Sequence, residues 1–453
     1  MKKIFFLSVI SLMLVSSARL TAQTITYNGK EYFLNGANIP WNNYNNDFAT
    51  GYDSTFFETA LTQFEAYGIN CARFWLHTDG GRSPLFDTAT GGVTGLPPGF
   101  FPAMDDLFAR ARRHNVMLIP SIWSFPMTNN DSAWGLFGGM HANLIEDSAL
   151  TRTYINNALI PMVQRYANEC SLLAWEVMNE PEWSMNVPFG GTQTQVVPAA
   201  DMQRFTGMIA EAIHQNSHKM VTTGSAALRY NSTQNSISTY CAGNYWSDHS
   251  IQAAYNKPLA YLDFYEIHYY DWMTGILSYD PYQSGRQASY WNLDKPTIIG
   301  ESQGNSTNHT PAAMLSSAYA GGYAGVLFWS YAASADSAGS FYQFDNALLA
   351  TSTSMPGVVN FHSDSCSLYN GIKAAAENHI AICPNPASDM ISIKGIVNMT
   401  SIKMYDMPGR LVMETEASES TTLNTSALPP GIYLLILCDS DNREMINKVV
   451  IDK

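Results

Sequence analysis

The chain has 453 residues, of which 46% are hydrophobic and 14% are charged. This length provides for two or three domains with at least one large core, and the apolar content excludes a disordered chain. With 24 Lys plus Arg against 38 Asp plus Glu, the formal net charge is −14, which disfavours binding to nucleic-acid phosphates and to anionic lipid. Past residue 20 no apolar run is long enough to span a bilayer. We therefore expect a globular protein with no nucleic-acid partner and no stable membrane span.

The first 22 residues have the layout of a secretory signal peptide. Lys2 and Lys3 precede an apolar run over 4–15, and small residues lead to Ala22. We expect cleavage after Ala22 and export of the mature chain. Export allows disulfides, but the six cysteines show no C-x-x-C pair and no zinc-type spacing, so no pairing follows from the sequence.

From residue 33 to 329 one pattern repeats: a short apolar or β-branched run, a loop, and then a segment with helical periodicity. Apolar residues spaced as in Met104, Leu107, Phe108 and Ala111 indicate helices with one face packed against a sheet. The repetition is typical of an α/β fold, and eight units favour a (β/α)8 TIM barrel over a doubly wound sheet. The predicted strands cover residues 33–38, 71–76, 116–122, 173–180, 220–224, 264–268, 297–301 and 325–329.

The last part of the chain is built differently. All ten tryptophans lie between Trp41 and Trp329. After residue 383, short β-type runs alternate with turn signals, which predicts a small all-β, β-sandwich-like domain. Its expected strands cover residues 390–394, 401–405, 410–414, 431–437 and 448–451. The predicted organisation is a signal peptide over 1–22, a catalytic barrel over 23–377 and a C-terminal β domain over 378–453.

Functional groups of a (β/α)8 barrel project from the C-terminal ends of its strands. Glu180 closes the fourth predicted strand and Glu301 closes the seventh. Two carboxyl groups facing across one cleft are what retaining glycoside hydrolysis requires, because one protonates the leaving oxygen and the other attacks the anomeric carbon. Most glutamates are solvated loop residues, but both of these follow apolar strands at the catalytic rim.

Other strand ends carry residues suited to the same site. Arg73 in the second strand offers a permanent charge that could keep a carboxylate ionised. His268 and Tyr270 after the sixth strand are two apart, and therefore lie on one side of an extended chain. Trp329 ends the eighth strand, where a flat indole could stack on a sugar. Each residue taken alone could equally be a buried structural residue.

Together these residues resemble glycoside hydrolase family 5, a family of clan A barrels, over about residues 25–375: Arg73, Asn179-Glu180-Pro181, His268-Tyr269-Tyr270, Glu301 and Trp329. The resemblance implies that Glu180 is the general acid/base and Glu301 the nucleophile. It also implies that Asn179 contacts the sugar 2-hydroxyl and that Tyr270 donates a hydrogen bond to the nucleophile. Strict strand alternation would send Asn179 and Glu180 to opposite faces, so we expect a bulge at that strand end.

Within the family, the segments Ala174-Trp175-Glu176 and Phe328-Trp329-Ser330-Tyr331 resemble endo-β-mannanases more than cellulases. We expect a retaining endo-β-glycosidase acting on β-mannan or glucomannan, without cofactor or metal. An endo-β-1,4-glucanase is the alternative. Tryptophans in or beside the predicted rim loops indicate an open groove: Trp41, Trp123, Trp134, Trp183, Trp272 and Trp291.

The tail resembles the type A C-terminal sorting domain of the type IX secretion system over about residues 380–453. The resemblance rests on Pro384-Asn385-Pro386-Ala387-Ser388, Pro430-Gly431-Ile432-Tyr433 and the final Lys448-Val449-Val450-Ile451-Asp452-Lys453. It implies type IX secretion machinery as a partner and a location outside the cell or on its surface. An appended sugar-binding module is the alternative for this segment.

Three other interpretations of the barrel remain open at this point. Gly300-Glu301-Ser302-Gln303-Gly304 matches the G-x-S-x-G elbow of serine hydrolases, with Ser302 as nucleophile and His309 among the possible bases. A silent carbohydrate-binding barrel would need no chemistry. His214 and His218 are spaced as metal ligands on a helix, but no third ligand lies near them in the sequence.

Overall fold

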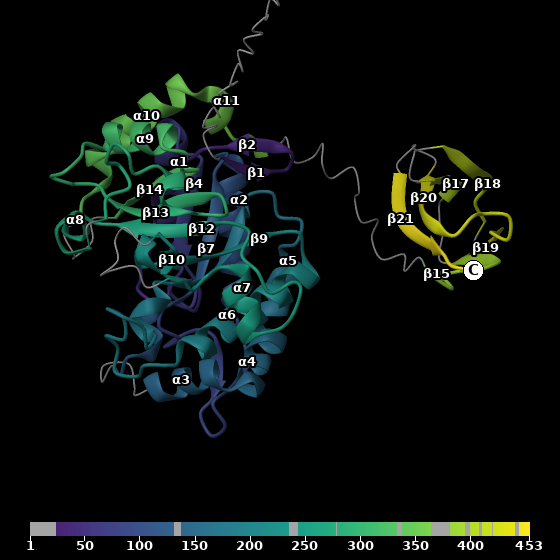
Figure 1. The fold of residues 1–453 in the computed structure, drawn as a ribbon, viewed down its shortest axis with the longest axis horizontal. Helices are drawn as coiled ribbons and strands as arrows, with labels where there is room; N and C mark the ends of the chain where they lie inside the picture. The colour runs from purple at the N-terminus through teal and green to yellow at the C-terminus, as the bar shows by residue number, and fades with distance from the viewer. Residues whose placement is uncertain are drawn as a thin grey trace, which may run out of the picture. The chain divides into compact units, whose positions relative to one another are not determined.

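The computed structural model describes residues 24–130, 137–234, 243–277, 279–332, 338–363, 381–394, 399–406, 410–418, 420–439 and 444–453. The chain divides into two compact units, Met1–Ser363 and Asp364–Lys453 (Figure 1). The predicted signal peptide over 1–22 and the predicted domain boundary at 377/378 lie outside the described residues. Both stay predictions.

Eight parallel strands close into a barrel in the first unit, which confirms the predicted (β/α)8 fold. Each strand begins and ends within about two residues of its expected limits, which is the precision that sequence patterns allow. In order around the barrel the strands are β3 (Leu34–Asn38), β4 (Cys71–Trp75), β7 (Met117–Ser124), β8 (Ala174–Asn179), β9 (Met220–Ser225), β12 (Tyr265–Tyr269), β13 (Thr297–Gln303) and β14 (Gly325–Trp329).

Helices connect the strands and lie around the barrel (Figure 1). Helix α1 begins where the Asp53 side chain accepts hydrogen bonds from the backbone N–H groups of Thr55 and Phe56. The helices are α1 (Ser54–Ala66), α2 (Phe100–Arg113), α3 (Gly138–Glu146), α4 (Ser148–Tyr154), α5 (Ile160–Arg165), α6 (Ala199–Asn216), α7 (Asp248–Ala254), α8 (Asp271–Leu277), α9 (Pro311–Ala320), α10 (Asp345–Ser354) and α11 (Pro356–Val359). Short antiparallel pairs are β1 (Ile25–Tyr27) with β2 (Lys30–Tyr32), β5 (Leu85–Asp87) with β6 (Gly92–Gly95), and β10 (Asn231–Ser232) with β11 (Gly243–Asn244).

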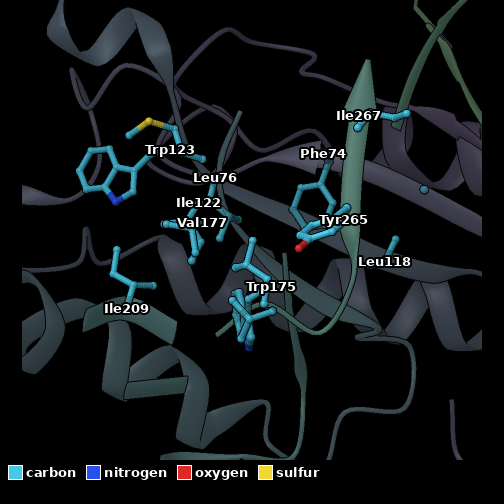
Figure 2. Close-up of a cluster of buried hydrophobic side chains, with 14 of the residues drawn as sticks. Phe74, Leu76, Leu118, Ile122, Trp123, Trp175, Val177, Ile209, Tyr265 and Ile267 are labelled. Carbon is cyan, nitrogen blue, oxygen red and sulfur yellow. The ribbon is translucent and has the colours of Figure 1, made fainter. Parts of the chain in front are cut away.

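The main core lies between the barrel strands and the surrounding helices. Phe74 on β4, Val177 on β8 and Ile267 on β12 belong to one buried cluster with Ile209 of α6 (Figure 2). Burying a side chain of this size stabilises the fold by about 1.5–3 kcal/mol. Because neighbouring residues of a strand point to opposite faces, the residues between these apolar ones point into the barrel, where the chemistry is expected.

The second unit consists of two antiparallel sheets, which confirms the predicted all-β tail. One sheet contains β15 (Ala381–Cys383), β16 (Met390–Lys394) and β19 (Ser420–Asn424); the other contains β18 (Leu411–Glu416), β17 (Met399–Asp406), β20 (Gly431–Asp439) and β21 (Glu444–Ile451). Ile391 and Leu423 of the first sheet share a buried cluster with Leu435 and Val449 of the second. The two sheets therefore enclose a separate core.

No helix in the described part of the chain has the length and apolarity needed to cross a membrane. Cys170 is disulfide-bonded, whereas Cys71 and Cys438 are free and buried.

Candidate active site

The seven side chains that the sequence singles out all lie within barrel strands or directly after them. These are Arg73 on β4, Asn179 and Glu180 at the end of β8, His268 and Tyr270 at the end of β12, Glu301 on β13 and Trp329 on β14. Hydrogen bonds join Arg73 to Asn179 and Glu301, Glu301 to Tyr270, and, separately, Glu180 to His268. Trp329 lines the same cleft as the two glutamates. The structure thus brings together the whole predicted set.

Glu180 leaves β8 in an unusual backbone conformation. Its φ of 49° and ψ of 51° lie in the left-handed region, which is strained for a residue other than glycine. The register between β8 and β9 shifts between Glu176 and Asn179, which confirms the expected bulge. The shift and the left-handed turn allow both Asn179 and Glu180 to face the cleft.

The Glu180 carboxyl group is hydrogen-bonded through both oxygens. His268 Nδ1 lies 2.8 Å from Oε1, and the Trp183 indole N–H donates to Oε2 at 2.8 Å. Burial raises the pKa of Glu180 to about 7, although the Trp183 N–H and the Arg73 charge oppose this rise. Burial lowers the pKa of His268 to about 4, so the imidazole is neutral near pH 7. Glu180 can therefore hold or release a proton near neutrality.

Glu301 is held by two donors instead. Arg73 Nη1 donates to Oε1 at 2.8 Å, and the Tyr270 hydroxyl donates to Oε2 at 2.6 Å. Burial raises the pKa of Glu301, whereas His268, Arg73 and Tyr270 lower it by favouring the ionised form. Oxygens of Glu180 and Glu301 lie within 4.8 Å of each other. The two carboxyl groups therefore face a common space, and burial raises the pKa of both, but they have different hydrogen-bond partners.

Arg73 is the centre of a buried ionic network that sequence reasoning found only in part. Its guanidinium binds Glu176 through two hydrogen bonds of 2.5 and 2.7 Å, Asn179 Oδ1 at 2.7 Å and Asn38 Oδ1 at 3.0 Å. A fully buried charge is tolerated only when it is paired and hydrogen-bonded in this way. A charged residue at an inward position of an apolar strand was the available signal for Glu176.

Glu266 is a second buried acid that the sequence interpretation missed. Its Oε1 lies 2.7 Å from Arg73 Nε. Burial and the neighbouring Glu176 carboxylate raise the pKa of Glu266 well above its usual range, whereas the Arg73 charge opposes this rise. Glycine on the next strand makes room for it, because a Cβ at Gly300 would stand 2.0 Å from Glu266 Oε1. Glu266 is thus a third buried acid packed around Arg73, beside Glu176 and Glu301.

The rim encloses an aromatic cleft of about 500 Å³. Trp329 meets Trp75 nearly edge to face, with ring centroids 5.4 Å apart. Of the six tryptophans expected at the rim, Trp41, Trp183 and Trp272 line this cleft, and Trp134 lies outside the described residues.

For Trp123 and Trp291 the expectation was wrong, since both are fully buried. Strand β7 extends two residues beyond its predicted end, to Ser124, so Trp123 lies inside it and packs on His77 and Tyr154. Trp291 ends a short 3-10 helix and packs on Tyr279 and Tyr290. Neither ring is available to a polysaccharide.

The geometry does not assemble a serine-hydrolase triad around Ser302. This buried side chain donates towards Met314 Sδ at 3.4 Å and shares a 2.7 Å hydrogen bond with the Tyr282 hydroxyl. His309 Nε2 instead lies 2.8 Å from Asp280 Oδ2. Among the described residues no hydrogen bond joins Ser302 to a histidine, which an activated serine requires.

The spacing of His214 and His218 does not produce a pair of metal ligands on one helix. Helix α6 ends at Asn216, and His214 Nε2 lies 3.1 Å from Asp263 Oδ2. Within the part of the chain that the structure describes, the one group of acids and histidines close enough to hold a cation is Glu180, His268 and Glu301. These are the residues of the carboxyl pair itself.

Comparisons with known proteins point to the same chemistry. A mannan endo-1,4-β-mannosidase of Mytilus edulis is 31% identical over 336 residues, covering 69% of this chain and 88% of that protein. A mannan endo-1,4-β-mannosidase of Cryptopygus antarcticus is 29% identical over 332 residues, covering 68% of this chain and 83% of that protein.

Solved structures agree with these relatives, and the tail matches a separate family. The β-mannanase of the blue mussel Mytilus edulis superposes with a TM-score of 0.65 at 28% identity, covering 75% of this chain and 98% of that one. The endo-1,4-β-mannanase of Eisenia fetida gives a TM-score of 0.64 at 28% identity, covering 73% and 94%. Residues 381–452 match the secretion system C-terminal sorting domain. The chain therefore belongs to the mannan endo-1,4-β-mannosidases of glycoside hydrolase family 5 and carries a C-terminal secretion-sorting domain.

Proposed function

We propose that this enzyme is a retaining endo-β-mannanase in which Glu180 is the general acid/base and Glu301 the nucleophile. The observation that carries the proposal is the separation of the two carboxyl groups, whose oxygens lie within 4.8 Å of each other in the lining of the aromatic cleft. Retaining glycosidases place these groups about 5–5.5 Å apart, whereas inverting enzymes need roughly 6.5–9.5 Å to admit a water molecule. The observed separation favours retention.

In the first step, a Glu301 oxygen attacks the anomeric carbon of the bound mannosyl unit. The bond from that carbon to the glycosidic oxygen breaks, and Glu180 gives its proton to the departing oxygen. Burial prepares Glu180 for this step because it raises the pKa to about 7 and keeps a proton available. The products are a covalent glycosyl-enzyme on Glu301 and the shortened chain, which leaves with a new hydroxyl group.

In the second step, water replaces the departed chain. Glu180, now ionised, removes a proton from the water. The water oxygen attacks the anomeric carbon, and the bond from that carbon to Glu301 breaks. Arg73 and Tyr270 stabilise the returning Glu301 carboxylate through the hydrogen bonds described above. Two inversions at the same carbon give net retention of the β configuration.

The remaining site residues take supporting roles in this proposal. Asn179 Nδ2 donates one hydrogen bond to Ser124 Oγ at 3.0 Å, and an amide nitrogen carries a second hydrogen that can reach the sugar 2-hydroxyl. Trp329 offers an indole surface on which a sugar ring can stack. His268 contacts Glu180 and lies 3.6 Å from Glu301 Oε2, so it keeps the two acids apart in a defined geometry.

Mannan is proposed as the polysaccharide because the relatives are named for it. Endo action is proposed because tryptophans line the cleft. Glucan remains the alternative backbone. The test is a product profile of the purified enzyme on β-mannan, glucomannan, carboxymethylcellulose, mixed-linkage glucan and xylan. Short manno-oligosaccharides with little early monosaccharide support the proposal. Preferential cleavage of carboxymethylcellulose assigns an endoglucanase, and release of monosaccharide alone rejects endo action.

The sorting domain implies export by the type IX machinery to the cell surface or beyond. We propose that the barrel acts there, on polysaccharide too large to enter the cell. The tail then serves as an address for the secretion machinery, and the signal peptide expected at residues 1–22 directs the first crossing of the inner membrane.

A further inference from the structure

The Glu180 carboxyl group accepts a hydrogen bond from Trp183, a residue that has no direct part in the two-carboxyl mechanism. Trp183 Nε1 donates to Glu180 Oε2 at 2.8 Å, opposite His268, which hydrogen-bonds Oε1. We propose that Trp183 is a positioning residue that holds Glu180 and biases it towards the ionised form needed to activate water. This inference rests on the acid/base role proposed above for Glu180.

The backbone after β8 is shaped to create this contact. Glu180 in its left-handed conformation precedes the 3-10 helix Pro181–Ser184, whose first residue is a proline. Residues three apart in such a helix lie above one another, so the third residue after Glu180 returns to its side chain. Backbone N–H of Trp183 also donates to the Glu180 carbonyl oxygen at 3.2 Å. The indole is therefore placed by local geometry and by the cleft wall it lines.

The chemistry of the indole determines the direction of the effect. An indole N–H can donate a hydrogen bond but cannot accept one. It therefore binds an ionised carboxylate more strongly than a neutral acid, and it lowers the proton affinity of Glu180. Burial acts in the opposite direction and raises the pKa of Glu180 to about 7. Trp183 thus prevents burial from fixing Glu180 in its protonated form, which would block the second step.

Other groups also act on Glu180, and the test must separate them from Trp183. The charged and titratable neighbours are Arg73 on β4, Glu176 on β8, Tyr230 after β9, His268 on β12 and Glu301 on β13. None of these side chains is altered when the indole alone is changed. A shift caused by Trp183 can therefore be recognised by substituting the indole while leaving these five in place.

The experiment compares Trp183→Phe with Trp272→Phe across a pH series. Both substitutions remove an indole from the cleft wall, but Trp183 is the one that donates to Glu180. A hydrogen bond to a charged group corresponds to about one to two pKa units, so the basic limb of kcat/KM should move up by about one to two units in Trp183→Phe. In Trp272→Phe, the basic limb of kcat/KM should stay at the wild-type pH, whatever the change in KM.

A kinetic split gives a second readout. With an aryl mannoside whose leaving group needs no proton, the water step limits kcat. Trp183→Phe should then lower kcat by at least about fivefold at pH 7, because raising the pKa of Glu180 from about 7 by one unit reduces its ionised fraction from about one half to about one tenth. On mannan above pH 7, the same variant should retain more activity than the wild type. A basic limb that stays at the wild-type pH, or an unchanged kcat on the activated substrate, overturns the inference.

Two further measurements keep the result interpretable. Trp183→Met also lacks the donor and must give the same shift if phenylalanine disturbs the fold. An NMR titration of carboxyl-labelled enzyme, with Glu180→Gln to assign the signal, reads the pKa without turnover. If Glu180→Ala hydrolyses mannan at the wild-type rate, the proposed function fails. If Glu180→Ala is impaired but the Trp183 variants titrate as the wild type, this inference alone fails.

Discussion

Substitution of Tyr270 by phenylalanine removes one of the two hydrogen bonds that favour the ionised form of Glu301. The Tyr270 hydroxyl donates to Glu301 Oε2 at 2.6 Å, while Arg73 independently holds the other oxygen. A hydrogen bond to a charged acceptor contributes about 1.5–3 kcal/mol, and a pKa unit corresponds to about 1.36 kcal/mol. Because the lost donor favoured the carboxylate, the pKa of Glu301 should rise by about one to two units.

The nucleophile must be ionised, so the acidic limb of the pH profile of kcat/KM should move up with that pKa. At pH values below the limb, a shift of one unit lowers kcat/KM about tenfold, because activity there follows the ionised fraction. Well above the limb the loss should be much smaller. The assay is mannan hydrolysis from pH 4 to pH 9, with the fold checked by circular dichroism at each pH.

Tyr282→Phe provides the matched control. Its hydroxyl makes a 2.7 Å hydrogen bond with Ser302 on the same strand as Glu301, outside the cleft. This variant should keep the wild-type acidic limb. If Tyr270→Phe is folded and its acidic limb coincides with that of the wild type, Tyr270 does not control the charge of Glu301, and the reasoning is refuted.

Three other predictions follow from the site and the two units. Glu301→Ala should lose mannan hydrolysis and form the α-mannosyl azide when azide is added to an activated mannoside, whereas Glu180→Ala should give the β-azide; identical products from both variants would contradict the assigned roles. Deletion of residues 381–453 should leave the activity and thermal midpoint of the barrel unchanged, because each unit has its own core, but should stop export beyond the periplasm; a destabilised barrel would make the tail structural. Burial lowers the pKa of His141 to about 4, so its neutral form stabilises the fold above the unfolded value of about 6.5, and this contribution is lost as pH falls. The free energy of unfolding lost in His141→Gln, measured in urea, should therefore shrink by about 2 kcal/mol between pH 7 and pH 5, and a pH-independent difference would contradict burial as the cause.

The barrel could be predicted because its signal is periodic. Each strand is an apolar run, and each helix has one apolar face, so eight repetitions determine the fold even where single limits are off by a residue or two. The tail was harder. Strands β15 and β19 were missed, and β19 carries the sequence Ser-Thr-Thr-Leu-Asn, which lacks the alternation of a half-buried strand.

The main site residues could be predicted because they end strands, whereas their partners could not. Glu266 lies inside a strand, and its contact with Arg73 depends on the packing of the neighbouring strands around the guanidinium. The contact of Trp183 with Glu180 depends on one left-handed residue, which no residue pattern encodes. Trp123 was expected in a rim loop because the third strand was predicted to end at residue 122. Strand β7 continues to Ser124, so Trp123 is a strand residue and its ring is buried in the core.

Trapping the covalent intermediate tests the central claim most directly. A 2-deoxy-2-fluoro-β-mannosyl donor with a good leaving group slows both steps by destabilising the oxocarbenium-like transition state, while the leaving group restores the first step. The glycosyl-enzyme should then accumulate, and mass spectrometry of the digested protein should locate the fluorosugar on Glu301. A label on Glu180 or Ser302, or inactivation without any label on Glu301, would contradict the account.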